Sequence, residues 1–311
     1  MAIKKIPYAD HDEWLQIRKQ YIGGSDAGAI IGLNPYSSPY AVWAEKVGFV
    51  PGFEGNTKTK VGSYLEEFVA QMFEDETGKK VRRCNFTLVN DQFPWACANL
   101  DREIVGEDAL LEIKTTNSFV NTKKFKQGEY PDQWMVQMTH YLSVTGKKKA
   151  YLAVLSECKD FRIFELERDE SEINALMEAE SKFWNTYVVP IKAPPVDGSY
   201  STTEAVKQIF QTADEYTADL NGMDHLLAQR KIFTDLKKDT ETNIAEIDNQ
   251  LKVLMGSASK AVCGNYSISW KIQNTSGLDR DAIRRDYPSF DFSKYASQAR
   301  VFRVTEKRSK S

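Results

Sequence analysis

The chain has 311 residues, 41% of them hydrophobic and 27% charged, with a formal net charge of −3. This composition is typical of a globular protein and allows one large core or two domains. There is no run of about 18 apolar residues, and the first residues lack the apolar region of a signal peptide, so we expect a cytoplasmic protein with no membrane span. The charge balance excludes a protein that binds nucleic acid through an overall basic surface.

Cysteine and histidine are too few and too scattered for a zinc site or a disulfide framework. The three histidines form no cluster, and the cysteines contain no CxxC pair. The four cysteines are Cys84, Cys97, Cys158 and Cys263. The sequence therefore argues against a metal centre built from histidine or cysteine.

The first predicted helix, over residues 8–22, carries Arg18 beside its packed side. Two glycines end it, and Ser25 and Asp26 then follow as candidate N-caps of a second helix. A helix N-terminus with free N–H groups, a serine hydroxyl and an arginine seven residues earlier can bind a phosphate group. Capping beside a surface arginine explains the same residues equally well.

Two further helices are predicted before the first strand. Residues 39–47 place Trp43 on an apolar side, and residues 60–77 repeat apolar side chains at steps of three and four up to Gly78. Glu66 and Glu67 lie within this second helix. A solvated acid is the usual interpretation, and an inward-facing metal ligand is the alternative.

Strands are predicted over residues 81–88 and 94–98, and the stretch that follows them carries the most chemical information. Asp101 lies just after an apolar run, and residues 109–114 form another strand. In that strand Glu112 and Lys114 share one face, because successive side chains of a strand alternate. Two carboxylates and an amine can therefore converge at the ends of two neighbouring strands.

Neighbouring carboxylates that are removed from water repel each other, and a divalent cation removes this cost. Asp101, Glu112 and the carbonyl of Ile113 are sufficient protein ligands for Mg²⁺. Lys114 could orient or deprotonate an attacking water, provided that the site lowers its pKa. This is the arrangement of a metal-dependent phosphodiesterase. The tripeptide Glu-x-Lys alone is weak evidence, because it occurs three times in the chain and a surface ion pair also explains it.

The rest of the first domain is predicted as a helix over 132–144, a hairpin over 150–166 and a helix over 170–187. The first of these helices places Gln137 on the side opposite its core candidates, among them Tyr141. The order of helices and strands predicts an α/β core. Three basic clusters, at residues 79–83, 123–126 and 147–149, are more simply explained as solvated turns than as nucleic-acid contacts.

A linker is predicted over residues 191–200, between a core of residues 1–190 and an extension of residues 201–311. Apolar residues seven apart in this extension predict a seam of about three heptads, which fits long helices arranged as an antiparallel pair. A strand over 266–270, a short helix over 279–285 and a strand over 301–304 complete an accessory α+β unit. It lacks a carboxylate cluster, and both partner docking and DNA contact are open to it.

Over roughly residues 8–190, the sequence resembles the phage-type recombination exonucleases of the YqaJ and lambda exonuclease group, in the PD-(D/E)XK nuclease superfamily. The matching positions occur in one order along the chain. They are Trp14, Arg18, Ile22-Gly23-Gly24-Ser25-Asp26, Gly32 to Tyr36, Ser38-Pro39, Gly62, Leu65-Glu66, Asp101, Glu112-Ile113-Lys114, Gln137, Tyr141 and Val144-Thr145-Gly146. The resemblance implies a restriction-endonuclease-like core, in which helices flank a central mixed sheet. It also implies Mg²⁺-dependent digestion of duplex DNA from its 5′ ends, which leaves 3′ single-stranded overhangs.

The resemblance also implies roles for individual residues. The ligands of one metal ion are matched by Asp101, Glu112 and the Ile113 carbonyl, and an acid that serves a second ion is matched by Glu66. The catalytic lysine is matched by Lys114, and a glutamine that lines the site is matched by Gln137. A 5′-phosphate anchor is matched by Arg18 with Ser25. The expected cofactor is a pair of Mg²⁺ ions, with Mn²⁺ as a substitute. Thr139 departs from the family, which often has a second glutamine there, and this leaves the role of Gln137 less certain.

The expected partners are double-stranded DNA ends, a single-strand annealing protein and further copies of the chain, as in a trimeric ring. The expected location is the cytoplasm of a bacterial host of a phage or prophage. Two other functions fit the residues. One is an endonuclease on the same core, and the other is a non-catalytic DNA-binding or scaffold protein whose C-terminal helices recruit a partner.

Overall fold

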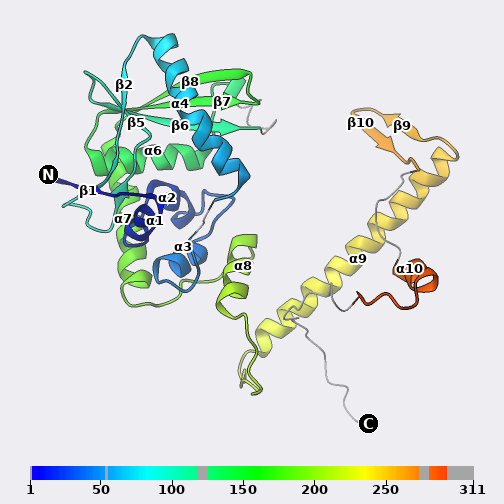
Figure 1. Ribbon diagram of the computed structural model, residues 1–311. Helices are drawn as coiled ribbons and strands as arrows, with labels where there is room; N and C mark the ends of the chain where they lie inside the picture. The colour runs from blue at the N-terminus through cyan, green and yellow to red at the C-terminus, as the bar shows by residue number, and fades with distance from the viewer. Residues whose placement is uncertain (1, 53–54, 118–124, 273–279, 293–311) are drawn as a thin grey trace. The chain divides into compact units, whose positions relative to one another are not determined.

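Figure 1 shows the computed structural model, which describes residues 2–52, 55–117, 125–272 and 280–292. The chain forms two compact units, Met1–Gln211 and Thr212–Ser311, which are described separately. In the described residues, the first unit holds a five-stranded and a three-stranded sheet, and the second unit holds a two-stranded sheet. All the predicted site residues lie in the first unit.

A mixed five-stranded sheet is the centre of the first unit, with the strand order β2-β5-β6-β7-β8. The inner strands β6 and β7 run parallel, and the other neighbouring pairs are antiparallel. The strands are β2 (Val81–Arg83), β5 (Arg102–Ile104), β6 (Ala109–Thr116), β7 (Lys149–Ser156) and β8 (Asp160–Glu167). This sheet, with helices on both faces, confirms the α/β fold predicted from the sequence.

Helices cover the two faces of this sheet. Because side chains alternate along β6, neighbouring residues of this strand pack against helices on opposite faces. α4 (Thr57–Thr77) covers one face (Figure 1). Leu111 and Ile113 share a core cluster with apolar residues of this helix. Leu110 packs with α6 (Asp132–Thr145) and α7 (Glu170–Phe183) on the other face. Glu112 and Lys114 have the parity of Leu110, so they point away from α4, as the sequence predicted.

The three-stranded sheet shows where the strand prediction was wrong. It consists of β1 (Ile3–Pro7), β3 (Phe86–Asn90) and β4 (Cys97–Ala98), in the order β1-β3-β4. The predicted strand over 81–88 is two strands, because Val81–Arg83 pairs with β5 whereas Phe86–Asn90 pairs with β1 and β4. The sequence analysis also missed β1, which has two lysines and no strict alternation.

Three short helices precede α4: α1 (His11–Lys19), α2 (Gly24–Ile30) and α3 (Pro39–Lys46). The start of α2 differs from the prediction, since Gly23 is the N-cap and Ser25 and Asp26 lie inside the first turn. The Asp26 side chain instead accepts a hydrogen bond from the Gly23 N–H, at 2.9 Å. Asp26 therefore makes the capping-box contact from the third position of the helix, and the Ser25 hydroxyl is available for another contact.

The first unit extends past the predicted linker over 191–200. A short π-helical segment, η1 (Trp184–Val188), follows α7, and α8 (Tyr200–Ile209) then packs against α3. Ala205 is buried in a cluster with Trp43, and the Thr202 hydroxyl donates a hydrogen bond to Ser38 Oγ at 2.8 Å. The unit thus ends at Gln211 rather than near residue 190, because the apolar side of α8 has a partner in α3.

The second unit contains one long helix where the heptad pattern suggested a pair. In the described residues it comprises α9 (Asp224–Met255), a hairpin of β9 (Lys260–Cys263) and β10 (Tyr266–Ser269), and α10 (Arg280–Asp286). The predicted seam is wrong because residues 210–223 form no helix, so its register is interrupted before α9. The predicted strand over 301–304 lies outside the described residues. None of the described helices is long and apolar enough to cross a membrane.

The contact between α2 and α6 depends on a glycine and gives a first testable prediction. A Cβ at Gly24 would lie 2.6 Å from Tyr141 Cε1 and 2.9 Å from Gln137 Cγ. We expect Gly24→Ala to lower the free energy of unfolding by about 1–3 kcal/mol, measured by urea denaturation. Gly198→Ala is the matched control, since a Cβ there meets no atom within 4 Å. Equal stability of the two variants would contradict the tight contact.

Candidate active site

A cleft of about 930 Å³ in the first unit brings together the residues predicted to form the site. Its walls come from α1, the start of α2, one side of α4, the start of β5, the middle of β6, and α6. All eight predicted residues line it: Arg18, Ser25, Glu66, Asp101, Glu112, Ile113, Lys114 and Gln137. The structure thus brings the predicted residues together in one cleft, and the role of each stays a prediction.

Asp101 is held at the point where β5 and β6 separate. The last residue pair of this ladder is Arg102 with Leu111, so the next backbone groups of β6 on that side belong to Ile113. The Ile113 N–H donates a hydrogen bond to Asp101 Oδ2 at 2.7 Å. Since the N–H and C=O of one strand residue face the same side, the Ile113 carbonyl is directed toward Asp101 as well.

Glu112 is almost fully buried, at 2% exposure, and is only partly satisfied. Its Oε1 accepts hydrogen bonds from Lys114 Nζ at 2.5 Å and from Gln137 Nε2 at 2.8 Å. Its Oε2 is buried without a hydrogen-bond partner in the described part of the chain. A buried carboxylate oxygen without a partner is costly, so this atom is a candidate ligand for a cation.

The electrostatics of Asp101 and Glu112 fit a divalent cation. Burial raises the pKa of Asp101 well above its usual value, and the nearby Glu112 raises it further. Burial also raises the pKa of Glu112, against the effect of Lys114. Two acids that repel each other in a buried site, with a carbonyl beside them, are the oxygen ligands that Mg²⁺ takes. The donor set therefore fits the expected metal.

Lys114 lines the cleft beside Glu112. Its side chain is 23% exposed and its amine forms an ion pair with Glu112. Burial acts to lower the pKa of Lys114, but Glu112 and Asp101 outweigh it, so the pKa lies above its ordinary value. A protonated Lys114 is suited to orient a water or to stabilise negative charge.

Glu66 lines the cleft but does not join Asp101 and Glu112 as a third ligand. Its carboxylate forms an ion pair with Arg102, whose guanidinium also donates to Glu67 and to the Asp101 carbonyl. In the described residues, no three acidic, histidine or cysteine side chains converge closely enough to hold one ion. A metal-binding role for Glu66 would thus involve a second ion, as the sequence resemblance implies.

Gln137 lies inside the site rather than opposite the core side of α6. Its Nε2 donates to Glu112 Oε1 and also lies 3.0 Å from the hydroxyl of Tyr141, one helical turn along the same side. Tyr141 therefore belongs to both the core and the cleft. Burial, and then the charges of Glu112 and Asp101, raise the pKa of Tyr141 well above its usual value. Thr139 is buried and does not line the cleft.

Arg18 and Ser25 form a pair at the N-terminus of α2. Arg18 Nη2 donates a hydrogen bond to Ser25 Oγ at 2.6 Å, and its guanidinium lies 5.4 Å from the ring of Trp14. Burial acts to lower the pKa of Arg18, but Asp26 above all keeps it raised, so the guanidinium is always charged. A cation, a hydroxyl and helix N–H groups together are the groups that bind a terminal phosphate.

Three residues of the site region were missed by the sequence analysis: Arg102, the site-facing role of Tyr141, and Lys46. Arg102 directly follows Asp101, and Tyr141 follows Gln137 by one helical turn, so both had a local signal. Lys46 had none, because its contact with Asp26 spans twenty residues.

Two of the three basic clusters are neutralised by acids. Lys79, Lys80 and Arg82 pair with Glu107, Glu74 and Glu103. Lys147 and Lys149 likewise pair with acids of the central sheet. Residues 123 and 124 of the second cluster lie outside the described residues. Arg83, the remaining basic residue of the first cluster, pairs with Glu67 and lines the cleft, so this cluster reaches the site rather than forming only a solvated turn.

Comparison with known proteins decides the family. The Uncharacterized protein YqaJ of Bacillus subtilis (strain 168) is 36% identical over 311 residues, which cover 98% of this chain and 97% of the relative. The chain belongs to the YqaJ-like viral recombinase family. The family model for the YqaJ-like viral recombinase domain matches residues 13–148, which include all eight site residues.

Solved structures show that this YqaJ-like protein shares its fold with a nuclease. The alkaline exonuclease LHK-Exo from Laribacter hongkongensis superposes with a TM-score of 0.51, at 18% identity, over 58% of this chain and 94% of that one. The same enzyme in complex with dAMP matches equally well. The confirmed fold is therefore that of the exonuclease group named by the sequence resemblance.

The raised pKa of Asp101 gives a prediction for the metal-free YqaJ-like protein. A carboxyl with a folded pKa above its unfolded value stabilises the fold below the unfolded pKa, and this contribution is lost as pH rises through the folded pKa. We therefore expect Asp101→Asn to raise Tm in EDTA by roughly 2–5 °C at high pH. The gain should vanish as acid protonates Asp101 in the unsubstituted protein. Asp75→Asn, an exposed acid of α4, is the control. The same gain at every pH would contradict this explanation.

Proposed function

We propose that this YqaJ-like protein is a Mg²⁺-dependent exonuclease that digests linear duplex DNA from its 5′ ends. The observation that carries the proposal is one cleft that combines two acids, the buried Glu112 and the half-buried Asp101, with a lysine and with an arginine–serine pair at a helix N-terminus. The family and the fold shared with LHK-Exo support a nuclease. That enzyme's complex with dAMP is consistent with a mononucleotide in such a cleft.

In this proposal each group in the cleft has one task. Asp101, Glu112 and the Ile113 carbonyl would hold a Mg²⁺ ion, and Glu66 would serve a second ion. Mn²⁺ would be an acceptable substitute, because it takes the same oxygen ligands. When bound, such ions supply charge stabilisation and lower the pKa of water. Lys114, protonated beside Glu112, would orient the attacking water and stabilise charge on the phosphate.

The direction of digestion would follow from the position of the phosphate anchor. Gly24, at the start of α2, packs against Gln137, which donates to Glu112, so the anchor and the acids share one connecting side chain. A 5′-phosphate bound by Arg18 and Ser25 would then place only the first linkages of that strand near the acids. Each cut leaves a new 5′-phosphate, so the product of one cycle is the ligand for the next.

The remaining 3′ overhang is a substrate for strand annealing. A single-strand annealing protein as partner, and a ring of several copies around DNA, stay predictions of the family resemblance. Either would keep the enzyme and its single-stranded product together.

The proposal is tested by digestion of linear 5′-phosphorylated duplex with Mg²⁺ or with EDTA. We expect degradation only with Mg²⁺, and a loss of at least about 10³-fold in Asp101→Ala, Glu112→Ala and Glu112→Gln. Glu157→Gln is the matched control, since Glu157-Cys-Lys159 is also an ion-paired Glu-x-Lys on the surface. Digestion of closed circular duplex would indicate an endonuclease. Full activity of Glu112→Gln, or no metal dependence, would favour a non-catalytic DNA-binding protein.

The anchor is tested by a change in end preference. Arg18→Ala should slow digestion of 5′-phosphorylated ends about 10- to 100-fold, because a charged hydrogen bond contributes roughly 1.5–3 kcal/mol. Digestion of 5′-hydroxyl ends should change little, since they lack the group that Arg18 binds. Arg82→Ala, an arginine paired with Glu103 outside the cleft, is the control. If both kinds of end slowed equally, Arg18 would not be a phosphate anchor.

A further inference from the structure

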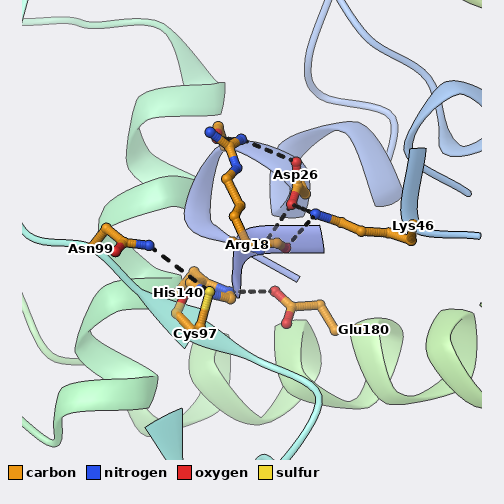
Figure 2. A network of polar contacts seen from close by, with 9 residues as sticks. Arg18, Asp26, Lys46, Cys97, Asn99, His140 and Glu180 are labelled. Atoms are coloured by element: carbon orange, nitrogen blue, oxygen red, sulfur yellow. Dashed lines mark hydrogen bonds and ion pairs between the residues drawn. The ribbon is translucent and has the colours of Figure 1, made fainter. Parts of the chain in front are cut away.

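The Arg18 and Ser25 pair is backed by a cation that does not reach the cleft. Lys46 is the last residue of α3, and its side chain is fully buried. Its Nζ lies 2.7 Å from Asp26 Oδ2 and donates a hydrogen bond to the backbone carbonyl of Arg18 at 3.2 Å (Figure 2). Lys46 thus contacts Asp26 and also the backbone of α1, the helix that carries Arg18.

Asp26 stands between the two cations. Its Oδ2 accepts from the Gly23 N–H and from Lys46, while its Oδ1 lies 3.4 Å from Arg18 Nη2. The same Nη2 is only 2.6 Å from Ser25 Oγ. Burial acts to raise the pKa of Asp26, but Lys46 and Arg18 hold it well below its usual range, so Asp26 is ionised. The short contact of Asp26 is with Lys46, and Arg18 makes its short contact with Ser25.

A second buried pair fixes the backbone in front of the anchor. His140 Nδ1 lies 2.7 Å from Glu180 Oε1, and His140 Nε2 lies 2.9 Å from the carbonyl of Cys97 (Figure 2). The Cys97 N–H in turn donates to the Ile22 carbonyl, and the Ile22 N–H donates to Trp95. The segment that enters α2 is therefore hydrogen-bonded on both sides of Ile22 to the chain around β4, which fixes the backbone that carries Ser25.

We propose that Lys46 is a positioning residue for recognition of a terminal 5′-phosphate. By neutralising Asp26, it leaves the Arg18 guanidinium directed to Ser25 and available to an incoming phosphate. Without Lys46, the buried charge of Asp26 would have Arg18 as its remaining cation and would draw the guanidinium away from the cleft. This role rests on the proposed function, because it assumes that Arg18 binds the phosphate.

The experiment measures binding rather than cleavage. Fluorescence anisotropy in EDTA compares the affinity of the full chain for duplexes with 5′-phosphate and 5′-hydroxyl ends. We expect tighter binding of the phosphorylated end, and Lys46→Met to lose about tenfold of this preference while its affinity for the hydroxyl end is unchanged. Lys46→Arg should keep the preference, because it keeps the buried cation. The double variant Lys46→Met with Asp26→Asn should regain most of it, because no unpaired anion remains to compete for Arg18.

The possible outcomes are distinct. Unchanged preference in Lys46→Met, or equal weakening for both ends, overturns the role of Lys46. If Lys46→Met does not fold, as judged by circular dichroism, the double variant decides, and loss of preference there overturns the role too. If the unsubstituted protein itself shows no preference, both the anchor and this role fail, while Mg²⁺-dependent digestion is judged by its own assay.

Discussion

The proximity of two carboxylates that are largely removed from water, the buried Glu112 and the half-buried Asp101, is the constraint on which the candidate site depends. Burial and mutual repulsion raise the pKa of Asp101, and burial raises that of Glu112. The chain offsets only part of this cost, through the Ile113 N–H, Gln137 and Lys114. A buried oxygen of Glu112 is left without a partner in the described residues. Such an arrangement lowers the stability of the folded protein, and groups of this kind are typical of binding and catalytic sites.

The fold meets this constraint with ordinary strand geometry. One face of β6 buries Leu111 and Ile113 under α4, and alternation sends Glu112 and Lys114 to the other face. Because β5 begins only at Arg102, its ladder with β6 does not reach Ile113, and the Ile113 N–H binds the Asp101 side chain instead. The position of the acids is thus set by the residue at which β5 begins. The helices add Gln137 and the Arg18 pair from the side.

How much could be predicted from the sequence follows from the range of each interaction. Alternation in 109–114, the apolar stripe of α4 and the acid at Asp101 are local patterns, and each led to the right place. The split of residues 81–88, the docking of α8 and the Lys46 contact depend on distant partners, which a single sequence does not reveal. The heptads beyond residue 206 failed for the opposite reason, because apolar spacing continued through a segment that forms no helix.

Contacts between residues distant in the sequence also connect the Arg18–Ser25 pair to the two acids. Gly24 has no Cβ, and only for that reason can the start of α2 press against Tyr141 and Gln137. Gln137 is held by both Glu112 and Tyr141, so it has little freedom to move. If Arg18 and Ser25 bind a strand end as proposed, this fixed side chain would set the distance from that end to the acids. In an exonuclease that distance decides which linkage is cut, so helix packing would determine the size of the product.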